Sequence, residues 1–116
     1  EYEMRIVSNL SPGTRSLKLH CYKGDGTDLG QQTLHPNEEY KFKICTNFFT
    51  ETRYYCDFHW REYRLTADFY VFDSFLSSLC EDQVFGPSKC QWTVEYPGFY
   101  FGMEWPYHVK APWLRY

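Results

Sequence analysis

Hydrophobic and polar residues alternate most regularly in the segment 54–60. Its even-numbered positions carry large apolar side chains or cysteine, whereas its odd-numbered positions carry Tyr55, Asp57 and His59. A period of two is typical of a β-strand that buries one face against a core. We therefore expect a central strand here, with Cys56 directed inward, where a disulfide could lock two sheets together.

Similar alternation predicts the other strands of the fold. We expect them at residues 5–10, 16–22, 40–44, 69–72, 90–96 and 99–103. The polar segments 23–30 and 62–68 are interpreted as a turn and a connection, and residues 74–87 as a long connection with one helical turn. Residues 105–116 contain two prolines, which predict an irregular or edge segment with one short strand.

The strand pattern favours a single all-β domain spanning residues 1–116. Seven to eight short strands without a long helix predict an antiparallel β-sandwich, and a small closed barrel is the alternative. The aromatic fraction of 22% supports this fold class, because aromatic residues favour strands.

Charge and hydropathy limit the classes of partner. The net charge is −3 and the basic residues are scattered, so we expect no nucleic-acid binding. No apolar run approaches the roughly 18 residues of a membrane span, so we expect no membrane insertion. The chain opens with Glu-Tyr-Glu rather than a basic and apolar leader, which fits a cytosolic protein or a processed secreted one.

The cysteine content favours secretion. Five cysteines in so short a chain predict two disulfides and one unpaired thiol. Cys21 shares the inward face of its expected strand, whereas Cys45 follows the outward-facing lysines and is the expected free thiol. Cys56 and His59 have zinc-like spacing but lie on opposite faces of a strand, so we expect no metal and no cofactor. The sequence Asn9-Leu10-Ser11 is a candidate glycosylation site.

Four histidines could serve as general acids or bases, because the histidine side chain titrates near neutral pH: His20, His35, His59 and His108. Lys18 and His20 could form an acid-base pair, but a solvated strand face is the interpretation that we favour. No Gly-x-Ser-x-Gly elbow accompanies the histidines, so we expect no enzymatic activity. The alternatives are a small ribonuclease-like secreted hydrolase and a carbohydrate or cell-wall-binding module, since exposed Trp and Tyr can stack on sugars.

An ordered set of motifs carries a family resemblance. The motifs are Ile6-Val7-Ser8-Asn9-Leu10, Leu17-Lys18-Leu19-His20-Cys21, Asp28-Leu29-Gly30, Tyr40-Lys41-Phe42, the segment 54–60 and Cys90-Gln91-Trp92-Thr93-Val94. At these spacings, from residue 6 to about residue 100, the chain resembles the plant self-incompatibility S1 family, the S-protein homologues.

This resemblance implies a small secreted plant protein with an antiparallel β-sandwich and four paired cysteines, at Cys21, Cys56, Cys80 and Cys90. Founding members act in pollen–pistil recognition, as stigma-secreted ligands for a pollen membrane protein. We prefer the pairing Cys21 with Cys90 and Cys56 with Cys80. The alternative is Cys21 with Cys56 and Cys80 with Cys90.

We therefore expect a secreted, monomeric, non-catalytic ligand for a cell-surface receptor. Partner choice should lie in exposed loops carried on the rigid sandwich. The candidate contacts are Arg61, Glu62, Tyr63 and Arg64, and residues 23–28 form a second candidate surface.

Overall fold

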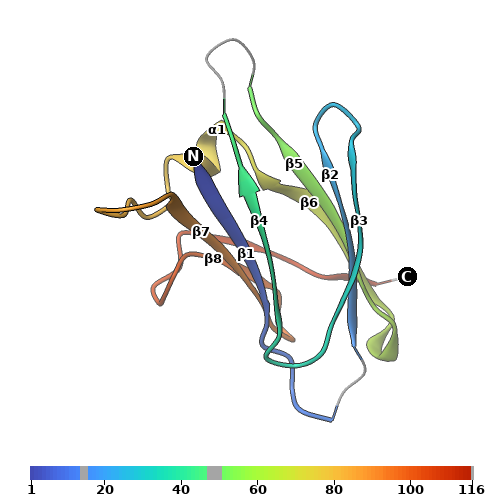
Figure 1. Cartoon of the computed structure of the whole chain (residues 1–116). Helices are drawn as coiled ribbons and strands as arrows, with labels where there is room; N and C mark the ends of the chain where they lie inside the picture. Colours follow the sequence, from blue (N-terminus) through green and yellow to red (C-terminus); the bar gives the residue numbers. More distant parts are fainter. Residues whose placement is uncertain (14–15, 47–50, 116) are drawn as a thin grey trace.

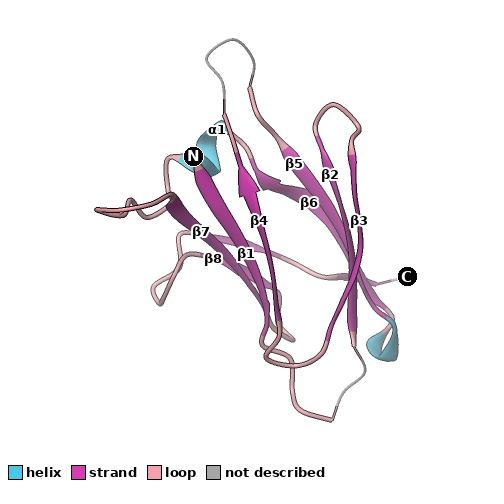
Figure 2. Cartoon of the chain, viewed as in Figure 1, coloured by secondary structure: helices cyan, strands magenta, loops and turns pink. Residues whose placement is uncertain are grey.

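Two five-stranded sheets pack face to face in the computed structural model, which describes residues 1–13, 16–46 and 51–115 (Figure 1). The first sheet contains, in spatial order, β4 (Glu39–Ile44), β1 (Tyr2–Ser8), β7 (Ser88–Val94), β8 (Phe99–Phe101) and β9 (Val109–Ala111). The second contains β10 (Leu114–Arg115), β6 (Leu65–Phe72), β5 (Tyr54–Trp60), β2 (Leu17–Lys23) and β3 (Asp28–Leu34). The described helices are short, η1 (Arg61–Tyr63) and α1 (Ser74–Ser77), so the predicted all-β sandwich is confirmed (Figure 2).

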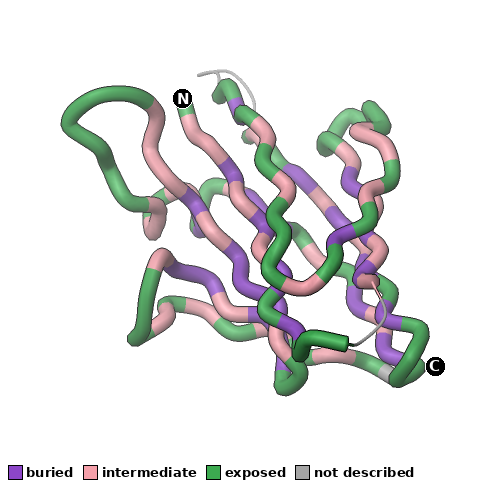
Figure 3. The backbone as a smooth tube through the Cα atoms, turned by 60° about the horizontal axis from the view of Figure 1, so that its bottom comes forward, coloured by how far each residue is buried: buried purple, intermediate pink, exposed green. Residues whose placement is uncertain are grey.

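The strand β5 lies at the centre of its sheet, between β6 and β2. Its even-numbered residues are buried and its odd-numbered residues are half-buried or exposed, as predicted. Phe58 and Trp60 are almost completely buried, at 0% and 1% exposure. Each such side chain stabilises the fold by about 1.5–3 kcal/mol through removal of apolar surface from water. Figure 3 shows the buried positions as purple stretches along the strands, whereas exposed positions fill the connections and alternate along the edge strands β3 and β4.

One strand pair departs from the antiparallel plan. The strands β1 and β7 run parallel, with Tyr2 opposite Ser88 and Ser8 opposite Val94. A parallel pair cannot be closed by a hairpin and needs a long crossover connection. Here that connection includes four strands of the second sheet, β2, β3, β5 and β6. The pairing therefore depends on residues far apart in the sequence.

The structure contains ten described strands, more than the seven to eight predicted. The strand β3 was missed, because residues 23–30 were interpreted as a turn. The turn ends before Asp28, and β3 is an edge strand in which only Leu34 is buried, so its hydrophobic pattern is weak. The interpretation of residues 62–68 as a connection is wrong from Leu65 onward, since Leu65 and Ala67 are buried in β6.

The disulfides join Cys21 to Cys56 and Cys80 to Cys90. The preferred pairing was therefore wrong, and the alternative is the one that the structure contains. Cys21 and Cys56 both point inward, but they are direct register partners on β2 and β5 of the same sheet, with Cα atoms 4.1 Å apart. Cys56 thus links two neighbouring strands and does not lock the two sheets together.

Candidate functional site

The predicted contact residues occupy the turn between β5 and β6. Arg61, Glu62, Tyr63 and Arg64 are all exposed, and the Arg64 amide donates to the Arg61 carbonyl at 3.1 Å to close the turn. The Tyr63 ring nevertheless packs on two neighbours, with centroid distances of 4.5 Å to Trp60 and 5.3 Å to Tyr96. Tyr63 therefore supports the fold as well as presenting a surface.

The second predicted surface, at residues 23–28, contains a tight turn whose polar groups bond within it. The Asp25 carboxylate accepts hydrogen bonds from the Thr27 hydroxyl, at 2.6 Å, and from the Thr27 amide, at 2.9 Å. These bonds hold the pKa of Asp25 below its ordinary value. The turn therefore has a clear structural role in the β2–β3 hairpin.

The most distinctive loop was missed by sequence reasoning. Residues 80–90, here called the clamped loop, are closed by three successive links. The Cys80–Cys90 disulfide is the first link. Glu81 and Lys89 then exchange both backbone hydrogen bonds, each 2.8 Å long, and the Ser88 hydroxyl donates to Asp82 at 2.8 Å. These links fix the base of the loop against β7.

The tip of the clamped loop presents two apolar side chains to solvent. Val84 is 92% exposed and Phe85 is 91% exposed, and Gly86 follows with a φ of 88°. Figure 1 shows the loop projecting sideways from the start of β7, well separated from the η1 turn. Exposed neighbouring apolar residues on an ordered loop are typical of interaction sites. The available signal was an apolar pair between two cysteines, within a segment otherwise interpreted as a connection.

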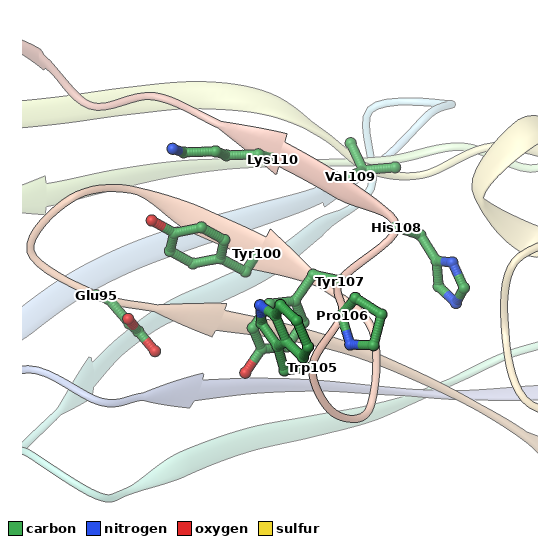
Figure 4. A pocket seen from close by; sticks show the side chains of 8 residues that line it. All are labelled: Glu95, Tyr100, Trp105, Pro106, Tyr107, His108, Val109 and Lys110. Atoms are coloured by element: carbon green, nitrogen blue, oxygen red, sulfur yellow. The ribbon is translucent and has the colours of Figure 1, made fainter.

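A cavity lies over the outer face of the first sheet, at β8 and β9. It has a volume of about 480 Å³ and is lined by Glu95, Tyr100 and residues 105–110 (Figure 4). The sequence predicted an irregular or edge segment with one short strand here. The structure has two short edge strands, β9 and β10, one more than predicted, and a loop that folds back beside Tyr100.

Of the four histidines, only His108 lines this cavity. His20 lies 2.6 Å from the Asp28 carboxylate and stacks on Tyr22, with ring centroids 4.5 Å apart. The hydrogen bond with His20 lowers the pKa of Asp28. His35 lies 3.0 Å from Glu38.

The closest approach to a ribonuclease-like set is on the outer face of the second sheet. Lys18 pairs with His59 in the β2–β5 register, and His20 pairs with Asp57 two positions along. His59 lies 3.6 Å from Asp57. The two histidines are therefore diagonal neighbours on a sheet face, each close to a carboxylate.

The remaining predicted site residues lie at the surface. Asn9 is exposed just after β1, and its side-chain amide donates to Glu95 at 3.1 Å. Cys45 is exposed after β4 and takes part in neither disulfide.

Within residues 1–13, 16–46 and 51–115, no group of three or more His, Cys, Asp or Glu side chains is arranged to hold a metal ion. No helix in that part of the chain has the length and apolar character needed to cross a membrane.

Comparison with known proteins identifies the family. Residues 3–113 match the family model for plant self-incompatibility protein S1. S-protein homolog 19 of Arabidopsis thaliana is 29% identical over 80% of this chain and 63% of its own length. S-protein homolog 2 of Arabidopsis thaliana is 33% identical over 72% of this chain and 49% of its own length.

Self-incompatibility protein S1 of Papaver rhoeas is 30% identical over 84% of this chain and 66% of its own length. The matches thus span between about half and two thirds of these relatives. No solved structure matches the chain significantly. Since the family model covers nearly all of the sandwich, the chain belongs to the plant self-incompatibility protein S1 family.

Proposed function

We propose that the protein is a secreted, non-catalytic signalling ligand that binds a cell-surface receptor through its exposed loops. Membership of a family of recognition proteins supports this role. The two disulfides suit an oxidising extracellular environment, because such bonds are rare in reducing compartments. Asn9 is proposed as a glycosylation site of the secreted chain.

The observation that carries the proposal is the clamped loop with its exposed Val84–Phe85 tip. Binding normally costs free energy because loops and side chains lose freedom at the interface. The three links at the base reduce that cost by ordering the loop before the receptor arrives. A phenylalanine that is 91% exposed can then bury most of its ring in a receptor pocket.

Acidic residues beside the tip indicate which charged groups the receptor pocket should carry. Glu81 and Asp82 are exposed and acidic, whereas the Lys89 ammonium pairs with Glu3 at 2.8 Å. We therefore expect an apolar receptor pocket with basic groups at its rim, because complementary charge speeds and orients association.

The η1 turn provides a second proposed contact, separated from the clamped loop. Arg61 and Arg64 are exposed there, and arginine is enriched among residues that dominate interfaces. Two separated surfaces would allow one ligand to contact two parts of a receptor.

The non-catalytic part of the proposal is supported by membership of a family of recognition proteins. His20 and His59, diagonal neighbours on the outer face of the second sheet, are the pair that a ribonuclease-like activity would use. Nuclease and esterase assays of the folded chain should detect no activity above that of a His20→Ala, His59→Ala double variant. Activity lost in that variant would replace the ligand proposal with the hydrolase alternative.

A receptor-binding experiment tests the clamped loop directly. The oxidised parent chain, labelled at its N-terminus, is titrated onto plant protoplasts, and a Val84→Ser, Phe85→Ser double variant is compared with it. Binding should be saturable for the parent and at least about tenfold weaker for the variant, which corresponds to about 1.4 kcal/mol.

Leu114→Ser is the matched control, because Leu114 is 53% exposed on β10, an edge strand of the second sheet, whereas the clamped loop leads into β7 of the first sheet. Both variants should melt close to the parent, since exposed substitutions usually change stability by less than about 0.5 kcal/mol. Equal binding by parent and double variant would exclude the tip as the contact. Absence of saturable binding by the parent to protoplasts from every tissue tested would exclude the receptor role.

A further inference from the structure

We propose that the cavity over β8 and β9 is a binding site for neutral oligosaccharides. This goes beyond the receptor role and does not depend on it. The cavity combines three aromatic rings, a balanced pair of charges and a loop that backbone hydrogen bonds hold in place.

The floor of the cavity follows from strand alternation in β8. Phe99 and Phe101 are buried, at 0% and 1% exposure, so Tyr100 between them faces outward. Lys110 pairs with Tyr100 across the β8–β9 register. The Lys110 ammonium lies 5.5 Å from the centroid of the Tyr100 ring. A cation and an aromatic face are thus fixed side by side.

The wall of the cavity depends on a close backbone approach at Gly102. This residue has a φ of 143°, and a Cβ atom there would lie 3.3 Å from the Tyr107 ring. Glycine therefore lets the loop fold back beside β8. The Gly102 amide donates to Gln91 at 3.0 Å, and the His108 amide donates to Phe101 at 2.8 Å, which fixes both ends of the loop.

The folded-back loop brings two more rings to the cavity. Tyr107 lies 5.4 Å from Tyr100 between ring centroids, with the planes tilted by 38°. Trp105 is 80% exposed. Figure 4 shows these three rings gathered between Glu95 on one side and His108 on the other. An exposed tryptophan beside two tyrosines offers broad apolar faces that a ligand can cover.

The charges of the cavity indicate an uncharged ligand rich in hydroxyl groups. Glu95 supplies one carboxylate and Lys110 one ammonium, so a phosphate-rich ligand would lack the several cations that it needs. A purely apolar ligand would instead separate both charges from water without replacing their hydrogen bonds. A sugar hydroxyl both donates and accepts, so it can bond the carboxylate and the ammonium alike.

Size and orientation agree with this ligand class. A volume of about 480 Å³ lies within the usual range for small-molecule sites, about 300–1,000 Å³. In the chain without a glycan on Asn9, the Asn9 side-chain amide donates to the Glu95 carboxylate at 3.1 Å and orients it. The aromatic rings can pack against the C–H faces of sugar rings while the charged groups bond the hydroxyls at their edges.

The test is a titration of the folded, oxidised chain with neutral and acidic oligosaccharides. The neutral probes are hexasaccharides of β-1,4-linked glucose, xylose and mannose, and the acidic probe is an oligogalacturonate. Calorimetry and tryptophan fluorescence should show saturable binding of at least one neutral probe. Its affinity should change little with added salt, because screening acts on charged partners.

Two substitutions test whether the neutral oligosaccharide binds in the cavity. Trp105→Ala should weaken binding of the neutral probe at least about tenfold, and Lys110→Gln should weaken it severalfold, while both keep the parent melting temperature. Phe85→Ala is the matched control, since it removes a highly exposed ring outside the cavity, 91% exposed against 80% for Trp105, and should leave sugar binding unchanged. Because receptor binding is measured separately on protoplasts, failure of one proposal leaves the other standing.

Three results would each overturn the inference. They are absence of binding by every neutral probe, equal binding by the parent and Trp105→Ala, and salt-sensitive binding of the acidic probe alone.

Discussion

Trp92 in the first sheet donates its indole N–H to the backbone carbonyl of Val71 in the second sheet, at 2.9 Å. Both residues are almost completely buried, at 1% and 0% exposure. The bond therefore links the two layers at a point that water does not reach. It also fixes how the β7 and β6 strands face each other across the core.

Trp92→Phe should destabilise the fold by about 1–3 kcal/mol, because the Val71 carbonyl would lose its partner in a buried position. Urea unfolding followed by circular dichroism measures this difference. Trp105→Phe is the control and should leave the unfolding midpoint unchanged. Parent-like unfolding of Trp92→Phe would show that the bond contributes nothing.

Trp60→Ala should be more destabilising than Trp92→Phe, at about 3–5 kcal/mol, because it leaves a large cavity in the core. The same urea unfolding measurement checks this.

The two disulfides should contribute unequally to stability. They join residues 35 and 10 positions apart in the sequence. In the chain-entropy model, these closures stabilise by about 4 and about 3 kcal/mol respectively. Replacing Cys21 and Cys56 with serine should therefore lower the melting temperature more than replacing Cys80 and Cys90.

The Cys80→Ser, Cys90→Ser variant should also show a local effect. Without the disulfide, only hydrogen bonds close the base of the clamped loop. A protease should therefore cleave the loop faster than in the parent, while the two sheets stay folded. Peptide mapping without reduction checks the disulfide pairing in the parent. In a separate labelling experiment on the folded parent, Cys45 should be the cysteine that reacts with a thiol reagent. A Cys21–Cys90 peptide would contradict the structure.

Alkaline pH should weaken the fold through Tyr55. Its hydroxyl donates to the Asp68 carboxylate on the neighbouring strand β6, and this bond, with partial burial, raises the pKa of Tyr55 to about 12. In the unfolded chain a tyrosine titrates near 10. The stabilisation is therefore complete below about pH 10 and is lost as the pH rises through about 12.

Tyrosinate absorbance measures this titration, and the parent should retain one late-ionising tyrosine that Tyr55→Phe lacks. Denaturant unfolding at several alkaline pH values measures the linked stability. The parent should lose more stability between about pH 10 and 12 than Tyr55→Phe does. Identical absorbance curves for the two proteins would contradict the assignment.

Substitutions in the η1 turn should separate binding from folding. Arg64 has a φ of 54°, a left-handed conformation that glycine adopts without strain. An Arg61→Ala, Arg64→Gly double variant should therefore keep the parent melting temperature and bind protoplasts less tightly. Tyr63→Ala should lower the melting temperature, because its ring packs on Trp60 and Tyr96. Unchanged binding by the arginine variant would remove this turn from the proposed interface.

Sequence alone predicted the elements whose signal is local. The β5 strand was predicted because four of its side chains enter the core in strict alternation. The β3 strand was not predicted, because an edge strand with one buried residue has little hydrophobic pattern to detect. The parallel pairing of β1 with β7 and the Cys21–Cys56 link depend on register between distant segments. Periodicity gives the face on which a cysteine lies, but not its partner.

The candidate sites were harder to predict for a related reason. Val84 and Phe85 look like ordinary connection residues until the structure shows that they are 92% and 91% exposed. The cavity at Tyr100 combines β8, β9 and a loop reversal at Gly102, which no short motif specifies. By contrast, the exposure of residues 61–64 was expected, because this polar segment follows a strongly patterned strand.

The clamped loop behaves as a cyclic peptide mounted on a scaffold. Residues 83–87 lie inside its three links, so their side chains can be exchanged while the strands keep their register. A descendant of this chain could thus acquire a different partner by changing a few codons, while the residues that determine the fold stay the same. The same property makes the segment a natural position for grafting foreign peptides onto the sandwich.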